Sequence, residues 1–182
     1  VRNLATTNLL DDMAEDFGMK CHEVPVGFKH ISSAMEKYDA VIGGESSGGL
    51  TIRGHIRGKD GIFAATLLIE MICVTGKKVS EILNEIYDKY GYRTMVEKAY
   101  EFKHELKERL MKILYSDKLL PDFPFDVEKV SYMDGVKVYF RNKGWIIARF
   151  SGTEPLLRVF SEMPDEAQAE EACEIMKNFL GV

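Results

Sequence analysis

Near its C-terminus the chain reads Arg149-Phe150-Ser151-Gly152-Thr153-Glu154-Pro155-Leu156-Leu157-Arg158. Apolar and β-branched residues at 145–150 and 156–160 predict a β-strand on each side of this stretch. The residues between the two strands include a glycine and a proline and therefore predict a tight turn. This hairpin indicates a sheet in the C-terminal part of the chain, with an arginine on each side of the turn.

The residues of this turn have the chemistry of a phosphate-binding site. A phosphate monoester at neutral pH carries about two negative charges and offers three strong acceptor oxygens. Arg149 and Arg158 could each meet two of these oxygens with a planar guanidinium, and the hydroxyls of Ser151 and Thr153 could donate to others. Gly152 lets backbone N–H groups approach without a side chain in the way. The alternative on these residues alone is an ordinary hairpin turn with two solvated arginines.

The segments around the hairpin predict a small α+β domain. A helix is expected over 104–115, because Leu106, Leu110 and Leu114 recur at helical spacing. Asp134-Gly135 lies between two alternating apolar runs and predicts a second hairpin. A last helix is expected over 165–180. Together these elements indicate a small antiparallel sheet with helices on one face, which we assign to residues 97–182.

Residues 1–96 show strands and helices in alternation instead. Strands are expected at 1–5, 19–26 and 40–43, and helices at 8–17 and 30–38. This order is typical of an α/β domain with a mixed sheet and flanking helices, in which ligand loops follow the carboxyl ends of strands. Two more helices are expected, at 62–75 and 79–90. The first is apolar almost all round and should therefore be buried. Residues 92–102 show no clear period, and we place the domain boundary within them.

A glycine-rich stretch follows the strand expected at 40–43 and reads Gly43-Gly44-Glu45-Ser46-Ser47-Gly48-Gly49. The carboxylate of Glu45 could accept hydrogen bonds from two adjacent sugar hydroxyls, and Ser47 could add one more. The flanking glycines would let a sugar ring lie against the backbone. The alternative on these residues alone is a flexible glycine-rich turn.

The two stretches together resemble a known family. Arg-x-Ser-Gly-Thr-Glu-Pro-x-x-Arg resembles the phosphate-binding loop in the last domain of the α-D-phosphohexomutases, and the glycine-rich stretch resembles the Gly-Glu-x-Ser-Gly sugar-recognition loop of the same family. The two motifs occur here in the family's order. Weaker agreements are Val26-Gly27-Phe28-Lys29 and His55-Ile56-Arg57-Gly58-Lys59-Asp60-Gly61. The resemblance spans nearly the whole chain and corresponds to the third and fourth domains of a four-domain enzyme.

This resemblance implies roles for individual residues. Glu45, Ser47 and Lys29 would contact the hexose. The phosphate would be held by Arg149, Ser151, Gly152, Thr153 and Arg158. Arg57 and Lys59 are weaker candidates for phosphate or sugar contacts. The motifs look more like those of phosphoglucomutases/phosphomannomutases than those of phosphoglucosamine mutases, but they do not rank glucose against mannose.

The resemblance also indicates what this chain does not contain. The family's phosphorylated serine lies in a Thr-x-Ser-His-Asn-Pro-like stretch and its metal ligands in an Asp-Gly-Asp-x-Asp-Arg stretch, and neither occurs in the sequence. We therefore expect no catalytic residue, no metal ligand and no mutase activity from this chain alone. The parent enzyme would interconvert hexose 1-phosphate and hexose 6-phosphate through a bisphosphorylated intermediate and an enzyme phosphoserine. Its cofactors would be Mg²⁺ and hexose 1,6-bisphosphate.

The expected partners are a hexose phosphate and the N-terminal domains of the same enzyme. A rival function from another class is a non-catalytic sugar-phosphate binding module. A third possibility is a structural fragment whose loops match the family by coincidence.

The composition excludes several other classes of protein. The chain is 46% hydrophobic, which suits ordinary globular cores. A net charge of −5 without a basic stripe argues against a nucleic-acid surface. No apolar run is long enough to cross a membrane, and no signal peptide is evident. Cys21, Cys73 and Cys173 lack metal-site spacing and are expected to be reduced, mostly buried thiols, which favours the cytoplasm. Because the first residue is Val1, we expect the chain to begin within a longer protein.

Overall fold

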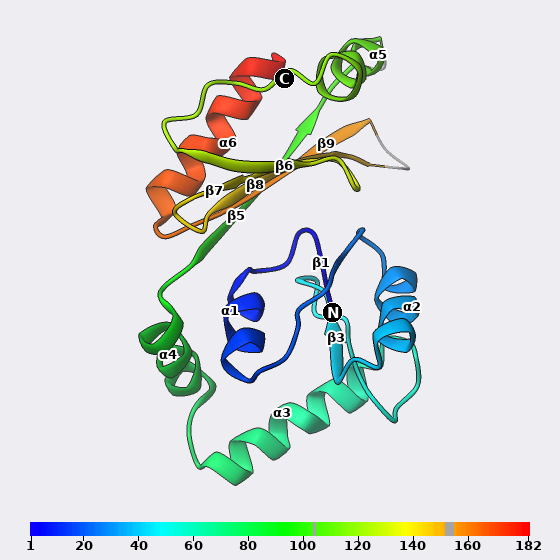
Figure 1. Ribbon diagram of the computed structural model, residues 1–182, viewed down its shortest axis with the longest axis vertical. Helices are drawn as coiled ribbons and strands as arrows, with labels where there is room; N and C mark the ends of the chain where they lie inside the picture. The colour runs from blue at the N-terminus through cyan, green and yellow to red at the C-terminus, as the bar shows by residue number, and fades with distance from the viewer. Residues whose placement is uncertain (104, 152–154) are drawn as a thin grey trace. The chain divides into compact units, whose positions relative to one another are not determined.

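The structure is a computed structural model that describes residues 1–103, 105–151 and 155–182. The chain forms two compact units, Val1–Tyr92 and Arg93–Val182 (Figure 1). The sequence-based division at 96/97 falls a few residues later, inside a strand. In the part of the chain that the structure describes, no helix is long and apolar enough to cross a membrane.

The first unit is built on a mixed four-stranded sheet, as predicted. The strand order is β2-β1-β3-β4, in which β1 runs parallel to β2 and β3, and β4 runs antiparallel to β3. The strands are short and comprise β1 (Arg2–Asn3), β2 (Glu23–Val24), β3 (Ile42–Gly44) and β4 (Leu50–Ile52). Helices α1 (Leu9–Asp16) and α2 (Phe28–Tyr38) connect the parallel strands and lie on opposite sides of the sheet (Figure 1). Right-handed crossovers in opposite directions produce this arrangement.

The contact between α2 and β3 fixes the strand that leads into the glycine-rich loop. Ile31 and Met35 of α2 are buried against the sheet. A Cβ atom added at Gly43 would lie 2.5 Å from the Met35 sulfur and 2.6 Å from an Ile31 methyl carbon. Gly43 is therefore required for close packing, and this packing sets the height of the loop above the sheet.

Helix α3 (Gly61–Thr75) confirms the predicted position of a helix but not its predicted burial. The Asp60 carboxylate accepts a hydrogen bond from the Phe63 N–H at the start, and Gly76 ends the helix with φ +67°. None of its residues is buried, and Ile62 and Val74 are 84% and 79% exposed. The prediction of burial was wrong because an apolar surface on all sides of a helix does not show which residues pack against it. The main contact of α3 within the unit is with the short strand β4.

Helix α4 (Val79–Tyr90) completes the first unit and contacts α1. The Asp16 carboxylate accepts hydrogen bonds from Lys89 Nζ at 2.5 Å and from the Tyr90 hydroxyl at 2.8 Å. These bonds connect the last turn of α4 to the end of α1. The C-terminal end of the first unit is thereby held beside its N-terminal helix.

The second unit is an antiparallel sheet with helices on one face, which confirms the predicted α+β class (Figure 1). The strand order is β5-β9-β8-β7-β6. The strands are β5 (Thr94–Glu101), β6 (Val127–Ser131), β7 (Val136–Phe140), β8 (Trp145–Phe150) and β9 (Leu156–Met163). The helices are α5 (Leu106–Met111), which continues as a π-helix over Lys112–Ser116, and α6 (Glu166–Leu180). One core joins these helices to the sheet, with Leu110, Val138, Leu157 and Met176 among its buried residues.

Strand β5 and the exposure of one cysteine correct the sequence-based predictions. Residues 92–102 show no period because β5 is an edge strand that pairs only with β9 and carries charged residues on both faces. Of the three thiols, Cys173 is buried and Cys21 half-buried, but Cys73 is exposed on α3. The expectation of mostly buried thiols is wrong for Cys73, because this residue lies on α3, none of whose residues is buried.

Candidate functional site

The glycine-rich loop joins β3 to β4 and is closed by its own backbone. The Glu45 N–H donates to the Gly49 carbonyl at 2.9 Å, and the Gly48 N–H donates to the Glu45 carbonyl at 3.0 Å. Gly48 has φ +89°, a conformation that favours glycine. Ser46 and Ser47 are exposed at the tip. The loop thus forms a turn closed by two backbone hydrogen bonds.

Glu45 connects three segments through its carboxylate. Its side chain is only 4% exposed. Oε1 accepts one hydrogen bond from Nδ2 of Asn3 and another from the Gly27 N–H, both at 3.0 Å. Oε2 lies 3.4 Å from Lys59 Nζ. The end of β1, the turn before α2 and the glycine-rich loop therefore meet at one side chain.

These contacts keep Glu45 ionised. Burial alone would raise the pKa of the carboxyl group, but the hydrogen bonds from Asn3 and Gly27 and the nearby Lys59 ammonium outweigh it and lower the pKa below the ordinary value. A buried carboxylate that is held in one orientation is an effective acceptor for ligand hydroxyl groups. This is the role that the sequence predicts for Glu45.

Of the other candidates in the first unit, the structure brings Lys59 into contact with Glu45 but pairs Arg57 with another residue. Lys59 contacts it directly, and the aliphatic part of the lysine crosses Gly49, where an added Cβ would lie 2.9 Å from Lys59 Cδ. Lys29 is exposed in the first turn of α2. Arg57 is not brought to the loop, because its guanidinium pairs with Glu36 of α2 at 2.7 Å in a separate hollow of about 150 Å³. Lys59 is therefore a stronger candidate than the sequence indicates, and Arg57 a weaker one.

A second, larger cavity of about 720 Å³ also lies in the first unit. At one end it is lined by Glu45 and Gly48 of the loop. Most of its remaining wall is apolar and includes Leu10, Phe17 and Ile42, each more than a third exposed. The cavity thus connects the polar loop with an apolar groove between α1 and β3.

The two arginines of the C-terminal hairpin are brought together. Arg149 on β8 and Arg158 on β9 are direct partners in the antiparallel ladder, so their side chains lie on the same face of the sheet. Ser151 follows β8, and its N–H donates to the Leu156 carbonyl at 2.8 Å, which closes the base of the turn. Gly152 and Thr153, the remaining predicted phosphate ligands, lie outside the residues that the structure describes.

Each arginine also has a carboxylate beside it, which the sequence analysis missed. Arg149 Nε lies 3.0 Å from Asp134 Oδ2, with both side chains about one-quarter exposed. Arg158 Nη1 lies 3.6 Å from Glu97 Oε1. Two like charges directly opposite on neighbouring strands repel each other, and an anion or a flanking carboxylate relieves that repulsion. From the sequence, Asp134 is predicted only as a turn residue. The one feature that could have indicated its contact with Arg149 is that its turn lies next to β8.

Among the described residues, no three His, Cys, Asp or Glu side chains converge as they would around a metal ion. The described parts of the two loops supply carboxylate, hydroxyl, ammonium and guanidinium groups. Groups of these kinds can bind and orient ligands.

Comparison with known proteins assigns both units to one set of domain models. The model described as "Phosphoglucomutase/phosphomannomutase, alpha/beta/alpha domain III" matches residues 1–90. The model described as "Phosphoglucomutase/phosphomannomutase, C-terminal domain" matches residues 93–178. These limits agree with the division of the structure into Val1–Tyr92 and Arg93–Val182.

Individual relatives extend well beyond this chain. It is 32% identical over 175 residues to a phosphoglucomutase/phosphomannomutase of Thermococcus kodakarensis, a match that covers 96% of this chain and 36% of the relative. It is 30% identical over 167 residues to a phosphoglucosamine mutase of Methanococcus maripaludis, covering 91% and 35%. A solved structure of a candidate phosphomannomutase from Thermus thermophilus superposes with a TM-score of 0.76 and 28% identity, covering 100% and 36%.

Proposed function

The chain belongs to the phosphoglucomutase/phosphomannomutase family, and on this premise we propose that it is the substrate-binding part of a phosphohexomutase. The first unit would recognise the sugar and the second would hold a phosphate. The observation that carries the proposal is the pairing of Arg149 with Arg158 across β8 and β9. Two guanidinium groups on one face of a hairpin, with Ser151 directly after β8, would form a site for a doubly charged phosphate monoester.

In this proposal each loop contributes to positioning. The Glu45 carboxylate would accept hydrogen bonds from the ring hydroxyls, and the Ser47 hydroxyl would donate one. Lys29 and Lys59 would also contact the sugar. Arg149, Ser151, Gly152, Thr153 and Arg158 hold the phosphate that does not react. These contacts would hold a bisphosphorylated intermediate, and its reorientation between two bound positions would let either phosphate face the reacting group. Such positioning is a recognised source of rate enhancement.

The chemical step itself would occur elsewhere in a longer parent protein, because this chain spans only 36% of the length of the Thermococcus kodakarensis relative. We assign to that parent the cytoplasmic interconversion of hexose 1-phosphate and hexose 6-phosphate, with a phosphoserine, hexose 1,6-bisphosphate and Mg²⁺. A related N-acetylphosphoglucosamine mutase from Aspergillus fumigatus has been solved with GlcNAc-6P and magnesium, and its 14% identity to this chain supports only the fold. Because no three His, Cys, Asp or Glu side chains among the described residues converge as around a metal ion, we assign the Mg²⁺ ligands to the remaining part of the parent.

The exposed apolar surface of the first unit fits the same proposal. It comprises α3, of which no residue is buried, and the groove of about 720 Å³ between α1 and β3. The matching domain model is described as alpha/beta/alpha, whereas much of this surface is not covered by the described residues of the first unit itself. We assign its cover to the remaining part of the parent phosphohexomutase.

Binding of a hydrophobic dye tests this assignment. The 182-residue chain should remain monomeric in sedimentation and should bind a dye such as anilinonaphthalene sulfonate. Charged replacements at Leu68 and Ile69, which are 46% and 61% exposed, should reduce dye binding without unfolding the unit. A dimer that binds no dye would mean that a second copy covers the surface, and the assignment would be wrong.

Titration with glucose 6-phosphate tests the proposed function directly. Amide signals near Ser151 and Arg158 should shift, and Arg149→Lys should weaken binding about fivefold because an ammonium cannot reproduce the planar two-bond contact. Arg141→Lys is the matched control, since Arg141 is exposed and follows β7 at the other end of β8. Unchanged amide signals near Ser151 at tens of millimolar ligand would contradict the phosphate assignment.

A coupled enzyme assay separates the mutase from the alternative, a non-catalytic sugar-phosphate binding module. The chain alone should show background turnover with glucose 1-phosphate, bisphosphate and Mg²⁺, since it supplies only binding groups. A longer protein that contains this chain should turn over the substrate and lose most of that activity on Arg149→Lys. Inactivity of the longer protein, together with intact ligand binding, would favour the binding module.

A further inference from the structure

Asn3 is a buried side chain whose role none of the sequence motifs indicates. It is the last residue of β1 and is 3% exposed. Its Oδ1 accepts hydrogen bonds from the Ala5 N–H at 2.9 Å and from the Thr6 hydroxyl at 2.8 Å. Because the Ala5 N–H can only donate, the atom that faces it must be the amide oxygen. The amide nitrogen is therefore the atom that points at Glu45, to which it donates at 3.0 Å.

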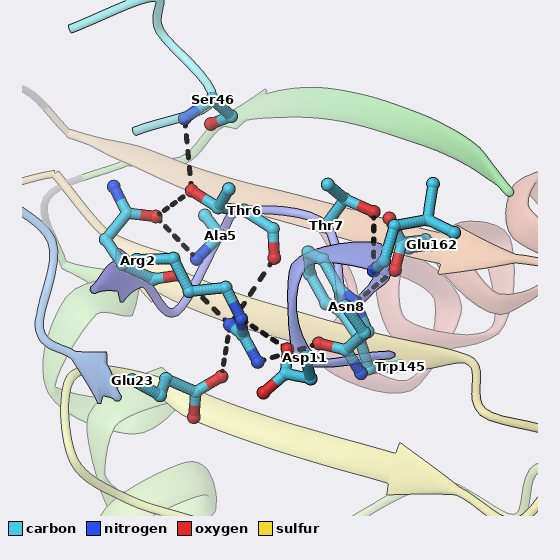
Figure 2. A network of polar contacts seen from close by, with 12 residues as sticks. Arg2, Ala5, Thr6, Thr7, Asn8, Asp11, Glu23, Ser46, Trp145 and Glu162 are labelled. Carbon is cyan, nitrogen blue, oxygen red and sulfur yellow. Dashed lines mark hydrogen bonds and ion pairs between the residues drawn. The ribbon is translucent and has the colours of Figure 1, made fainter. Parts of the chain in front are cut away.

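Thr6 extends this network to the glycine-rich loop. Its hydroxyl hydrogen is used in the bond to Asn3, and its oxygen accepts the Ser46 N–H at 3.0 Å (Figure 2). Two consecutive loop residues are thus fixed from the end of β1, Glu45 through its side chain and Ser46 through its backbone. In each hydrogen bond of this network, one group can donate and the other can accept.

The segment that carries Asn3 and Thr6 is itself held rigidly by Arg2. The guanidinium of Arg2, whose side chain is 4% exposed, contacts Asp11 and Glu23 at 2.6 Å each and donates to Asn8 Oδ1 at 2.9 Å (Figure 2). Asn8 was expected to start α1, but its side chain makes this bond instead of a helix cap. These contacts join β1, β2 and α1 without touching the loop.

We propose that Asn3 and Thr6 are positioning residues for sugar recognition: Asn3 orients the Glu45 carboxylate and Thr6 fixes the loop at Ser46. The inference rests on the proposed function, in which Glu45 contacts a hexose. Since Asn3 and Gly27 occupy Oε1, the oxygen that meets the ligand is Oε2, beside Lys59. One sugar hydroxyl placed there can donate to Oε2 and accept from the Lys59 ammonium.

The competing explanation is that Asn3 merely forms the turn after β1 through Oδ1. Asn3→Ser distinguishes the two roles because serine keeps an oxygen for Ala5 but removes the donor to Glu45 without adding a charge. If Asn3 orients Glu45, the variant should raise the pKa of Glu45, since the carboxylate loses a hydrogen bond. If Asn3 only forms the turn, the pKa should not change. Asn3→Asp should raise the pKa further, because it also adds a like charge.

Carboxyl ¹³C NMR on the 182-residue chain measures this pKa directly. Lys59 is the charged group that faces the Glu45 carboxylate, and Lys59→Met separates its effect from that of Asn3. Asn8→Ala is the matched control, because it removes a bond to Arg2 in the same segment and should leave the pKa of Glu45 unchanged. Asn3→Thr, which also retains a hydroxyl acceptor for Ala5, supplies the same measurement if Asn3→Ser does not fold.

Thr6→Val tests the second half of the network. The variant has nearly the same shape but cannot accept the Ser46 N–H, so hydrogen exchange at Ser46 should accelerate about tenfold while exchange in α2 stays constant. Both Asn3→Asp and Thr6→Val should weaken binding of glucose 6-phosphate severalfold.

The outcomes are distinguishable from failure of the proposed function. If the unmodified chain binds no glucose 6-phosphate, the proposed function fails, whereas the pKa of Glu45 and the exchange at Ser46 still report on the network. An unchanged pKa of Glu45 in Asn3→Ser, or an equal shift in Asn8→Ala, would overturn the positioning role of Asn3. Unaltered exchange at Ser46 in Thr6→Val would overturn that of Thr6.

Discussion

Replacing Asp134 by asparagine should strengthen phosphate binding by this chain about fivefold at low ionic strength. Asp134 Oδ2 accepts a hydrogen bond from Arg149 Nε at 3.0 Å. Asparagine can still accept this bond through its side-chain oxygen, so the guanidinium should keep its orientation. The substitution removes only the negative charge, which opposes the phosphate.

The size of the effect follows from the separation of the charges. With one guanidinium between them, a bound phosphate and Asp134 would lie roughly 6 to 8 Å apart, where each pair of unit charges repels by roughly 0.5 to 2.8 kcal/mol for effective permittivities of about 80 to 20. The side chains of Arg149 and Asp134 are about one-quarter exposed, so solvent and salt screen the interaction. A net gain of about 1 kcal/mol remains, which corresponds to about fivefold in Kd.

Calorimetric or NMR titration with glucose 6-phosphate at two salt concentrations measures the gain, which should shrink as salt is added. Asp134→Ala is the control that removes both the charge and the orienting bond, and it should gain less than Asp134→Asn. Weaker binding in Asp134→Asn than in the unmodified chain would refute the reasoning. It would show that the charge of Asp134 is needed to hold Arg149.

Three further predictions concern the packing of Gly43, the reactivity of the cysteines and the pH dependence of stability. Gly43→Ala should destabilise the first unit by about 1 to 3 kcal/mol in urea unfolding, because the new methyl group would overlap Met35, whereas Gly58→Ala, whose Cβ meets nothing within 4 Å, should not. Cys73 should react with a thiol reagent at pH 8 before Cys173, since burial raises the pKa of Cys173 to about 12; equal rates would contradict the burial of α6. The pKa of Glu45 is lowered in the folded chain, so its contribution to stability is complete above the ordinary value of 4.5 and is lost as pH falls through the folded pKa. The difference in unfolding free energy between the unmodified chain and Glu45→Gln should therefore narrow below pH 4.5, and a constant difference would contradict the shift.

Local patterns in the sequence were sufficient for much of the fold. The hairpin at 145–160, the helix at 62–75 and the alternation of strands and helices before residue 60 are short-range features, and the structure contains them. Strand β5 was missed because its identity depends on pairing with β9, which lies some sixty residues later in the chain. An edge strand with charges on both faces shows no period that a sequence window can detect.

The candidate site divides in the same way. The glycine-rich loop and the two arginines are contiguous motifs, so residue chemistry was enough to single them out. The groups that orient them are distant in sequence: Asn3 lies 42 residues before Glu45, and Asp134 lies 15 residues before Arg149. Such contacts arise from sheet order and turn geometry, which depend on the whole fold.

Different kinds of contact hold the glycine-rich loop and the two arginines of the C-terminal hairpin in position. Glu45 is almost fully shielded, and hydrogen bonds from neutral groups fix it, so its orientation should not depend on ionic strength. Arg149 and Arg158 are partly exposed and are balanced by carboxylates that a phosphate must compete with. Screening weakens both the attraction of the arginines for phosphate and the opposition of Asp134 and Glu97. Under the proposed function, discrimination among sugars would therefore reside in the glycine-rich loop of the first unit, whereas the second unit would bind the phosphate group that all hexose phosphates share.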